Sequence, residues 1–177
     1  MNITWAPWRM EYIEAGPQSV CMFCQKFSED RDQENHILYR SDLGFILLNL
    51  YPYNNGHLMV APVRHEGDIT RLNKNENNVL MDLVQKGVSV LNKAFKPDGF
   101  NIGLNLGAVA GAGITDHLHI HIVPRWQGDT NFMPVLSETK VMPQYLHKTY
   151  EILLPLFKET GTKQNPDKEM IQCKSSK

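Results

Sequence analysis

The amino-acid sequence predicts a single α+β domain that is built on an antiparallel sheet. Short apolar stretches recur between clusters of turn residues, which is typical of strands joined by hairpins. One longer stretch, residues 73–96, repeats its apolar positions at helical spacing. The chain has 177 residues, a length that suits one domain with a sizeable core.

The first third of the chain is expected to hold an irregular segment followed by three strands. Residues 1–36 are expected to be irregular, because prolines and glycines interrupt their beginning and residues 25–36 are polar enough for a surface loop. Residues 37–40 can form a short strand, and the apolar run at residues 44–50 suits a strand that is buried on both faces. After the turn-rich sequence Tyr-Pro-Tyr-Asn-Asn-Gly, residues 57–61 form the next expected strand.

The remainder of the chain alternates helices and strands. The helix at residues 73–96 ends at a Pro-Asp-Gly sequence, and the alternating residues 100–106 follow as a half-buried strand. A loop of small residues then leads to a strand at residues 117–123, which Pro124 is expected to stop. Residues 143–159 have helical spacing, although a proline within them is expected to bend or end the helix.

Composition and charge exclude several classes of function. The sequence has 18 Lys plus Arg and 19 Asp plus Glu, so it lacks the basic field that binds long nucleic acid without specificity. No apolar run approaches the ~20 residues that span a membrane, and the N-terminus lacks an apolar signal-peptide core. We therefore expect a cytoplasmic protein without nucleic-acid or membrane partners. Residues 1–160 form the expected domain, and the polar residues 161–177 form an expected disordered tail.

Three histidines alternate with apolar residues in the last expected strand. Side chains alternate between the faces of a strand, so His117, His119 and His121 are expected on one face, about 6–7 Å apart. A neutral imidazole is a good nucleophile toward phosphorus, and a protonated one can donate to a leaving oxygen. The preceding loop contains Gly111 and Gly113, whose backbone N–H groups can hold phosphate oxygens. This pattern indicates phosphate chemistry, and a catalytic zinc site with His-x-His ligands is the alternative.

The sequence at residues 117–123 resembles the histidine-triad (HIT) motif, His-φ-His-φ-His-φ-φ with φ apolar, and it matches at every position. Residues 5–10, 48–62, 99–107 and 124–132 resemble the same family, and most closely its mycobacterial-type diadenosine tetraphosphate phosphorylase branch. The resemblance therefore covers most of the chain. It implies a HIT-like fold, a five-stranded antiparallel sheet with two main helices, in which two copies pair into a ten-stranded dimer.

The resemblance also implies roles for particular residues. His119 would attack the α-phosphorus and form a nucleotidyl-histidine, while His121 would contact the phosphate and assist the leaving group. Asn49 would bind the ribose, and Asn105 would position the phosphates. The further expected substrate contacts are Gly111, Gly113 and Thr115 in the loop, with Trp126 and Tyr51 at the base.

The activity that the resemblance implies is the splitting of a dinucleoside polyphosphate. The phosphorylase branch indicates phosphorolysis of diadenosine tetraphosphate to ATP and ADP, with inorganic phosphate as second substrate and a homodimer or higher homo-oligomer as the assembly. Many triad hydrolases carry Gly-Gln-Ser or Gly-Gln-Thr before the triad, whereas this sequence has Gly-Ile-Thr, which weakens the case for hydrolysis. Hydrolysis of dinucleoside polyphosphates or nucleoside phosphoramidates is the alternative within the family. A non-catalytic nucleotide-binding sensor is the alternative from another class.

Cys21 and Cys24 form a Cys-x-x-Cys pair, which is half of a tetrahedral zinc site. The zinc-bearing members of the family complete that site with histidines that match His65 and His117. The resemblance therefore implies a structural zinc that pins the N-terminal segment onto the triad. His36 competes as the third ligand, and a pair of free thiols is the other alternative. No organic cofactor is expected.

Overall fold

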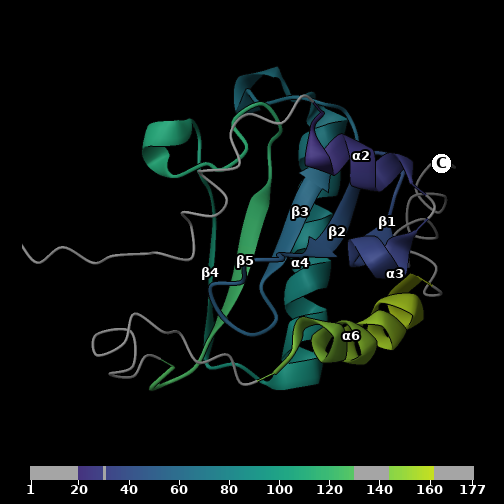
Figure 1. The fold of residues 1–177 in the computed structure, drawn as a ribbon, viewed down its shortest axis with the longest axis vertical. Coiled ribbons are helices and arrows are strands. Elements are labelled where there is room, and N and C mark those ends of the chain that lie inside the picture. Colours follow the sequence, from purple (N-terminus) through teal and green to yellow (C-terminus); the bar gives the residue numbers. More distant parts are fainter. Residues whose placement is uncertain (1–19, 30, 130–143, 162–177) are drawn as a thin grey trace, which may run out of the picture.

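Five strands form one antiparallel sheet in the computed structural model, which describes residues 20–29, 31–129 and 144–161. The strand order is β1-β2-β3-β5-β4 (Figure 1). The strands are β1 (Ile37–Arg40), β2 (Gly44–Leu48), β3 (Leu58–Pro62), β4 (Gly99–Leu104) and β5 (Ile120–Arg125). The expected α+β class and the expected five-stranded antiparallel sheet are therefore confirmed.

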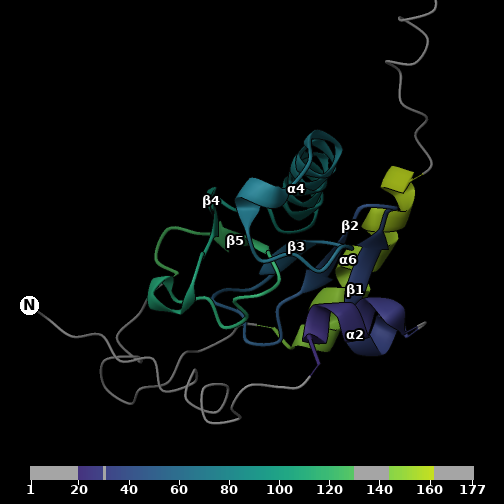
Figure 2. The same cartoon turned by 90° about the horizontal axis from the view of Figure 1, so that it is seen from above.

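Helices cover both faces of this sheet. One face packs against α4 (Lys74–Phe95) and α6 (Leu146–Gly161), and the opposite face packs against α2 (Met22–Ser28). Figure 2 shows α4 and α2 on opposite sides of the sheet. Successive side chains of a strand point to opposite faces, so on β2 Ile46 belongs to the first core and Leu47 to the second. This arrangement explains the continuous apolar run, because every residue of β2 is buried.

The helix α4 begins where its sequence provides a complete cap. The side chain of Asn73 accepts from the backbone N–H of Glu76, and the Glu76 carboxylate accepts from the backbone N–H of Asn73. The same carboxylate lies 2.7 Å from Nε of Arg64, and the hydrogen bonds from Arg64 lower the pKa of Glu76 to about 2. Arg64 directly precedes His65, so this ion pair ties the start of α4 to the segment that carries a predicted metal ligand.

The expected surface loop at residues 25–36 is wrong. The chain forms α2 there and then a single-turn helix, α3 (Asp32–Asn35). Phe23 and Phe27 lie one turn apart on α2 and pack against β2, which gives this polar segment an apolar face. The guanidinium of Arg40 donates to the carbonyl oxygen of Phe27 at 2.6 Å, which satisfies a carbonyl near the end of the helix.

The strand β5 starts and ends later than the expected strand at residues 117–123. Residues 117–119, which precede β5, do not pair with β3 because their backbone polar groups have other partners. The N–H of Leu118, for example, donates to the carbonyl of Glu66 at 2.8 Å. Pro124 was expected to stop the strand, but it lies beyond the residues that pair with β3. Its missing N–H therefore interrupts no hydrogen bond to that neighbour.

The helix α6 continues past Pro155, which was expected to bend or end it. Pro155 is exposed, whereas Leu153 and Phe157 are fully buried. The carbonyl that loses its partner therefore lies on the exposed side of the helix, where water can satisfy it. The expected irregular start of the chain and the expected tail at residues 161–177 lie mainly outside the described residues. Among the helices of the described ranges, none has the length and apolar character that a bilayer crossing requires.

Candidate active site and metal cluster

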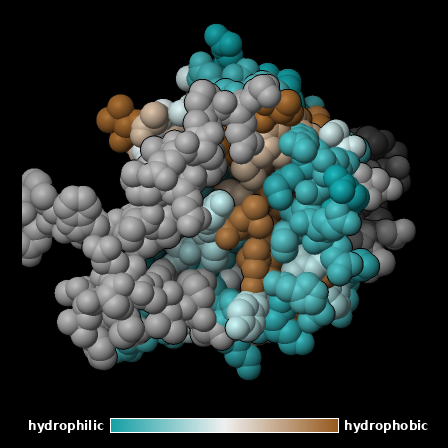
Figure 3. Space-filling view, in the orientation of Figure 1, coloured by the Kyte–Doolittle hydropathy of each residue, from teal (hydrophilic) through white to brown (hydrophobic). Residues whose placement is uncertain are grey.

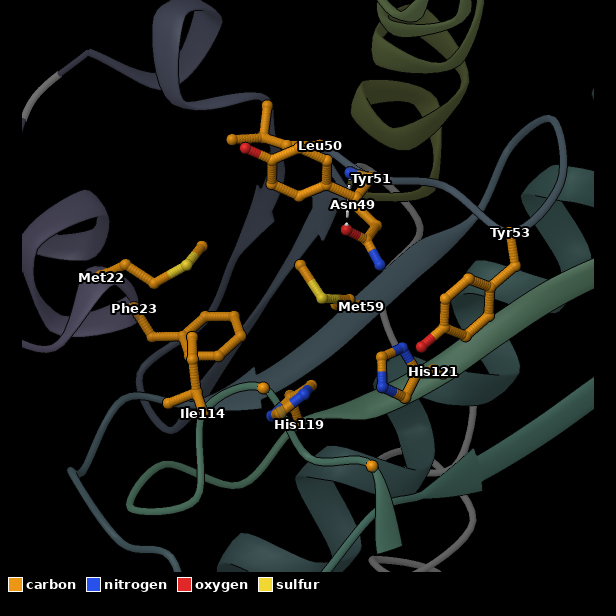
Figure 4. Close-up of a pocket in the computed structure, with 12 residues that line it drawn as sticks. Met22, Phe23, Asn49, Leu50, Tyr51, Tyr53, Met59, Ile114, His119 and His121 are labelled. Atoms are coloured by element: carbon orange, nitrogen blue, oxygen red, sulfur yellow. Dashed lines mark hydrogen bonds between the residues drawn. The ribbon is translucent and has the colours of Figure 1, made fainter. Parts of the chain in front are cut away.

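A pocket opens on the face of the sheet that carries α2. Figure 3 views this face and shows apolar surface in a hollow that polar surface borders. The pocket walls come from α2, from the β2–β3 hairpin and from the segment that leads into β5 (Figure 4). The lining residues are Met22, Phe23, Asn49, Leu50, Tyr51, Tyr53, Met59, Gly111, Gly113, Ile114, His119 and His121. The pocket thus brings together six of the predicted site residues: Asn49, Tyr51, Gly111, Gly113, His119 and His121.

Three other predicted contact residues lie outside the pocket lining. The side-chain amide of Asn105 donates to the carbonyl of Gly111 at 3.4 Å, so Asn105 contacts the loop without lining the pocket. Thr115 is exposed, beyond the part of the loop that reaches the pocket. Trp126 follows β5, and its backbone N–H donates to the carboxylate of Asp129 at 3.2 Å.

His119 presents an unprotonated ring nitrogen. Its Nδ1 atom lies 3.0 Å from the carbonyl oxygen of His117. A carbonyl can only accept, so Nδ1 carries the proton and Nε2 of the neutral ring has the lone pair. His119 is 7% exposed, and burial lowers the pKa of its ring below the ordinary value, while the hydrogen bond to His117 acts in the opposite direction. The neutral, nucleophilic form is therefore favoured near neutral pH.

In His121 the proton lies on the other ring nitrogen than in His119, and a neighbouring histidine, His57, determines this tautomer. His57 is fully buried, and its Nδ1 accepts the backbone N–H of Tyr53 at 3.0 Å. The proton of neutral His57 is therefore on Nε2, which lies 2.9 Å from Nδ1 of His121. Because that Nδ1 accepts, neutral His121 carries its own proton on Nε2. A lone pair on His119 and an N–H donor on His121 thus lie side by side, with ring centroids 4.9 Å apart.

His57 is a residue of this site for which the sequence predicts no role. This residue directly precedes the apolar strand β3, and a histidine in such a place needs a polar partner. The partner comes from the register of β3 and β5, in which Met59 lies opposite His121. A single polar residue in an apolar stretch was the available signal, but the sequence alone could not identify its partner.

A second site lies beside the pocket and consists of Cys21, Cys24, His65 and His117. The ligand atoms of these residues all lie within 4.8 Å of one another. Nδ1 of His117 lies 3.3 Å from Sγ of Cys21 and 3.5 Å from Sγ of Cys24. Nδ1 of His65 lies 3.4 Å from Sγ of Cys24. Ordinary Zn–S and Zn–N bonds in a tetrahedral site place neighbouring ligand atoms about 3.5 Å apart, so the donor set and its spacing fit zinc.

The surroundings of this cluster also suit a cation. Nε2 of His117 donates to the carbonyl of Pro62 at 2.9 Å, which leaves Nδ1 to face the two sulfurs. Burial raises the pKa of the Cys24 thiol to about 11, and the hydrogen bond and charge of Cys21 add to that effect. A cation between two sulfurs that lie so close together would stabilise them as thiolates, because it attracts the negative charge.

The metal-ligand cluster and the pocket share a wall. Phe23 lies between the two cysteines in the sequence, and its ring centroid is 5.1 Å from that of His117 and 5.0 Å from that of His119. Met22, its neighbour on α2, lines the pocket as well. The carbonyl of His117 in turn accepts the Nδ1 proton of His119. Holding the cluster in place therefore holds both the pocket wall and the ring of His119.

The three histidines of the motif do not converge on one metal position. His117 lies in the Cys/His cluster, whereas His119 and His121 line the pocket. In the part of the chain that the structure describes, this cluster is the one group of three or more closely spaced metal-binding side chains. The competing ligand His36 lies apart from it and packs edge-on against Tyr150, with ring centroids 5.8 Å apart.

Comparisons with known proteins agree with this geometry. The family described as HIT domain matches residues 30–128. A protein named AP-4-A phosphorylase, from Mycobacterium tuberculosis, is 41% identical over 157 residues, which cover 84% of this chain and 80% of that protein. A bis(5'-adenosyl)-triphosphatase from Dictyostelium discoideum is 29% identical over 73% of this chain and 91% of its own length.

Solved structures show the same fold. The crystal structure of a hypothetical histidine triad nucleotide-binding protein from Sulfolobus tokodaii aligns with a TM-score of 0.62 and 27% identity, covering 79% of this chain and 91% of that one. The family match spans more than half of the chain, and the 41% identical relative is matched over most of its length. Together with the alternating histidines, these matches show that the chain belongs to the HIT domain family.

Proposed function

We propose that this chain is a nucleotidyl transferase that splits dinucleoside polyphosphates through a nucleotidyl-histidine at His119. The observation that carries this proposal is the unprotonated Nε2 of His119 beside the N–H donor of His121 in one pocket. Attack on phosphorus requires a lone pair, and the departing oxygen requires a donor. The 41% identical relative named AP-4-A phosphorylase supports diadenosine tetraphosphate as the substrate.

The proposed reaction consists of two in-line displacements at the α-phosphorus. In the first, Nε2 of His119 bonds to phosphorus while the bond to the bridging oxygen breaks, and ATP leaves as that oxygen accepts from His121. In the second, an oxygen of inorganic phosphate attacks the same phosphorus and the P–N bond breaks. The products are ATP, ADP and one proton, and the two inversions give net retention at phosphorus.

The other predicted contacts keep their proposed roles. Asn49 suits the ribose, because its side chain lies at the pocket and its Oδ1 already accepts the Tyr51 N–H at 3.0 Å, which orients the amide. Gly111 and Gly113 suit the phosphates, since both line the pocket and neither has a side chain of its own that would keep a phosphate away. Asn105 would act by holding the Gly111 loop in place, which its hydrogen bond to that carbonyl supports. Direct contacts from Thr115 and Trp126 stay predictions.

Hydrolysis is the second candidate function. It shares the first displacement, and water then attacks the nucleotidyl-histidine to give AMP instead of ADP. The 29% identical relative named bis(5'-adenosyl)-triphosphatase favours this outcome. A non-catalytic nucleotide sensor would need no nucleophile, so the buried neutral ring of His119 argues against it.

We also propose that the Cys/His cluster binds one structural zinc ion. Its four protein ligands, Cys21, Cys24, His65 and His117, would complete a tetrahedral site and leave no position for substrate. When bound, the zinc would supply only a fixed cross-link between α2, the segment after β3 and the segment before β5. Every chemical step belongs to the histidines of the pocket.

We also propose that the protein is a cytoplasmic homodimer. The strand β4 stands at the end of the strand order, and a strand edge can pair with another chain. Ile102 on this strand is 49% exposed and Leu106, just after it, is 48% exposed. These features support the pairing of two copies into a ten-stranded sheet, with an adenine dinucleotide and inorganic phosphate as substrates.

Product analysis with labelled phosphate tests the proposed function. The protein is incubated with diadenosine tetraphosphate, with and without ³²P-phosphate. We expect ATP and labelled ADP in the presence of phosphate, and a nucleotidyl adduct on His119 when phosphate is withheld. AMP and ATP formed at equal rates without phosphate would refute phosphorolysis in favour of hydrolysis. Binding without any turnover would refute both.

A further inference from the structure

Tyr53 lies beside His121, at the end of the pocket away from α2. Figure 4 shows Met22 and Phe23 at one end, His119 in the middle, and His121 followed by Tyr53 at the other end. The Tyr53 ring stacks on that of His121, with centroids 5.7 Å apart and an interplanar angle of 28°. Tyr53 thus extends the row of polar groups beyond the two catalytic rings.

The hydroxyl of Tyr53 is a hydrogen-bond donor that has no role in the proposed reaction so far. It points toward His121 and the interior of the pocket (Figure 4). Tyr53 donates its backbone N–H to His57, but within the described ranges its hydroxyl has no hydrogen-bond partner. A half-buried phenolic O–H that faces a pocket is a ready partner for an anionic oxygen.

We propose that the Tyr53 hydroxyl and His121 form a phosphate subsite that is used twice in each catalytic cycle. In the first displacement the subsite holds the β-phosphate of the departing nucleotide. In the second it holds the inorganic phosphate that attacks. This inference rests on the proposed nucleotidyl transfer at His119 and identifies a specificity-determining residue for it.

The position of the subsite follows from the roles of the two histidines. The N–H of His121 donates to the bridging oxygen, and the β-phosphorus is bonded directly to that oxygen. The non-bridging oxygens of the β-phosphate therefore lie on the side of His121 where Tyr53 stacks. Both displacements take place in line with the bond between Nε2 of His119 and the α-phosphorus. The oxygen that attacks in the second step therefore takes the position of the oxygen that left in the first, and the acceptor phosphate occupies the position that the β-phosphate left.

The subsite also provides a reason for phosphate to compete with water. Inorganic phosphate brings further anionic oxygens that can accept from Tyr53, whereas a water molecule at the same position brings none. The hydroxyl therefore stabilises the transition state for phosphorolysis and not that for hydrolysis. Removal of a hydrogen bond to a charged group costs ~1.5 kcal/mol or more, which corresponds to at least about tenfold.

Tyr53→Phe separates the hydroxyl from the other contributions of this residue. The variant keeps the ring that stacks on His121 and the backbone N–H that donates to His57. Tyr145→Phe is the matched control, because Tyr145 is 90% exposed and lies outside the pocket lining. Folding of both variants is checked by circular dichroism and thermal unfolding.

Two ratios measured on the purified full chain test the subsite. We expect Tyr53→Phe to lower the ADP-to-AMP product ratio from diadenosine tetraphosphate about tenfold at fixed phosphate, with a matching rise in KM for phosphate. We also expect about a tenfold fall in the rate of ATP release relative to turnover of adenosine phosphoramidate, whose leaving group has no β-phosphate. Unchanged ratios, or equal losses on both substrates, would overturn the subsite. If the wild-type protein forms no ADP, phosphorolysis itself is refuted. The rate of ATP release relative to turnover of adenosine phosphoramidate then still tests the role of Tyr53.

Discussion

Nε2 of His57 lies 2.9 Å from Nδ1 of His121, and this contact sets the protonation pattern of the pocket. The backbone N–H of Tyr53 occupies the other nitrogen of His57, so the proton of the neutral ring must face His121. His119 receives the opposite pattern from the carbonyl of His117. One main-chain donor and one main-chain acceptor therefore make two adjacent histidines chemically different.

Replacing His57 is expected to impair catalysis more than substrate binding. His57→Phe removes the donor to His121, so the N–H that serves the leaving oxygen is no longer fixed, and we expect about a hundredfold loss in kcat with a small change in KM. His57→Gln can accept from Tyr53 and donate to His121, so it should recover most of the loss. Steady-state kinetics on the two variants measure the difference. Equal activity of Phe and Gln variants would show that His57 only fills space.

His119→Ala is expected to remove at least a thousandfold of the turnover, on the order of 4 kcal/mol of transition-state stabilisation. The reason is that the proposed covalent intermediate would form on Nε2 of this ring. The measurement is the rate of ATP formation from diadenosine tetraphosphate, and the trapped nucleotidyl adduct should disappear in parallel. His147→Ala is the control, because the His147 side chain is 66% exposed and lies outside the pocket lining. Full turnover by His119→Ala would exclude the covalent mechanism.

The pH profile should show that burial keeps His119 neutral. Because its pKa is lowered, the ring stays unprotonated until the pH falls below the ordinary range of histidine, and kcat/KM should decline only there. Phe23→Ala admits water beside the ring, which should raise the pKa and move the acid limb of kcat/KM to higher pH. Profiles of the two proteins measured in one buffer series make the comparison. An acid limb that does not move in Phe23→Ala would contradict the role of burial.

The spacing of residues along the sequence predicted those parts of the fold that do not depend on contacts between distant segments. The helical spacing of residues 73–96 predicted α4. The expected row of three histidines on one strand face is only partly correct, because His119 and His121 line one pocket while His117 lies in the Cys/His cluster, and β5 begins only at Ile120. The contact between His57 and His121 depends on the pairing of β3 with β5, which no local pattern contains. The helix α2 was missed for a related reason, because its stability comes from contacts with β2 that are distant in sequence.

Removing the expected zinc should weaken the fold and the active site together. Cys24→Ser deletes one of four ligands, so we expect less than one-tenth of the wild-type zinc content, a lower Tm and a higher KM for the dinucleotide. The rise in KM follows because Met22 and Phe23 lie between the two cysteines and line the pocket. Metal analysis, calorimetry and kinetics provide the three measurements. Cys173→Ser is the control, since Cys173 lies outside the described residues and the cluster contains the other two cysteines. A Cys24→Ser protein with full zinc content would exclude this ligand set.

Glu76→Gln is expected to destabilise the protein at neutral pH by about 1–2 kcal/mol, because it weakens the charge-assisted hydrogen bonds with Arg64. The sign of the pH dependence follows from the lowered pKa of Glu76. The carboxylate contributes stability above the ordinary pKa of glutamate, and that contribution is lost as the pH falls toward about 2. The difference in the free energy of unfolding between wild type and variant, measured by urea unfolding, should therefore decrease steadily as the pH falls. Glu151→Gln, at a side chain that is 47% exposed and pairs with Lys148, should cause almost no change. A difference that stays constant down to acid pH would show that the ionised form of the Glu76 carboxylate does not carry the effect.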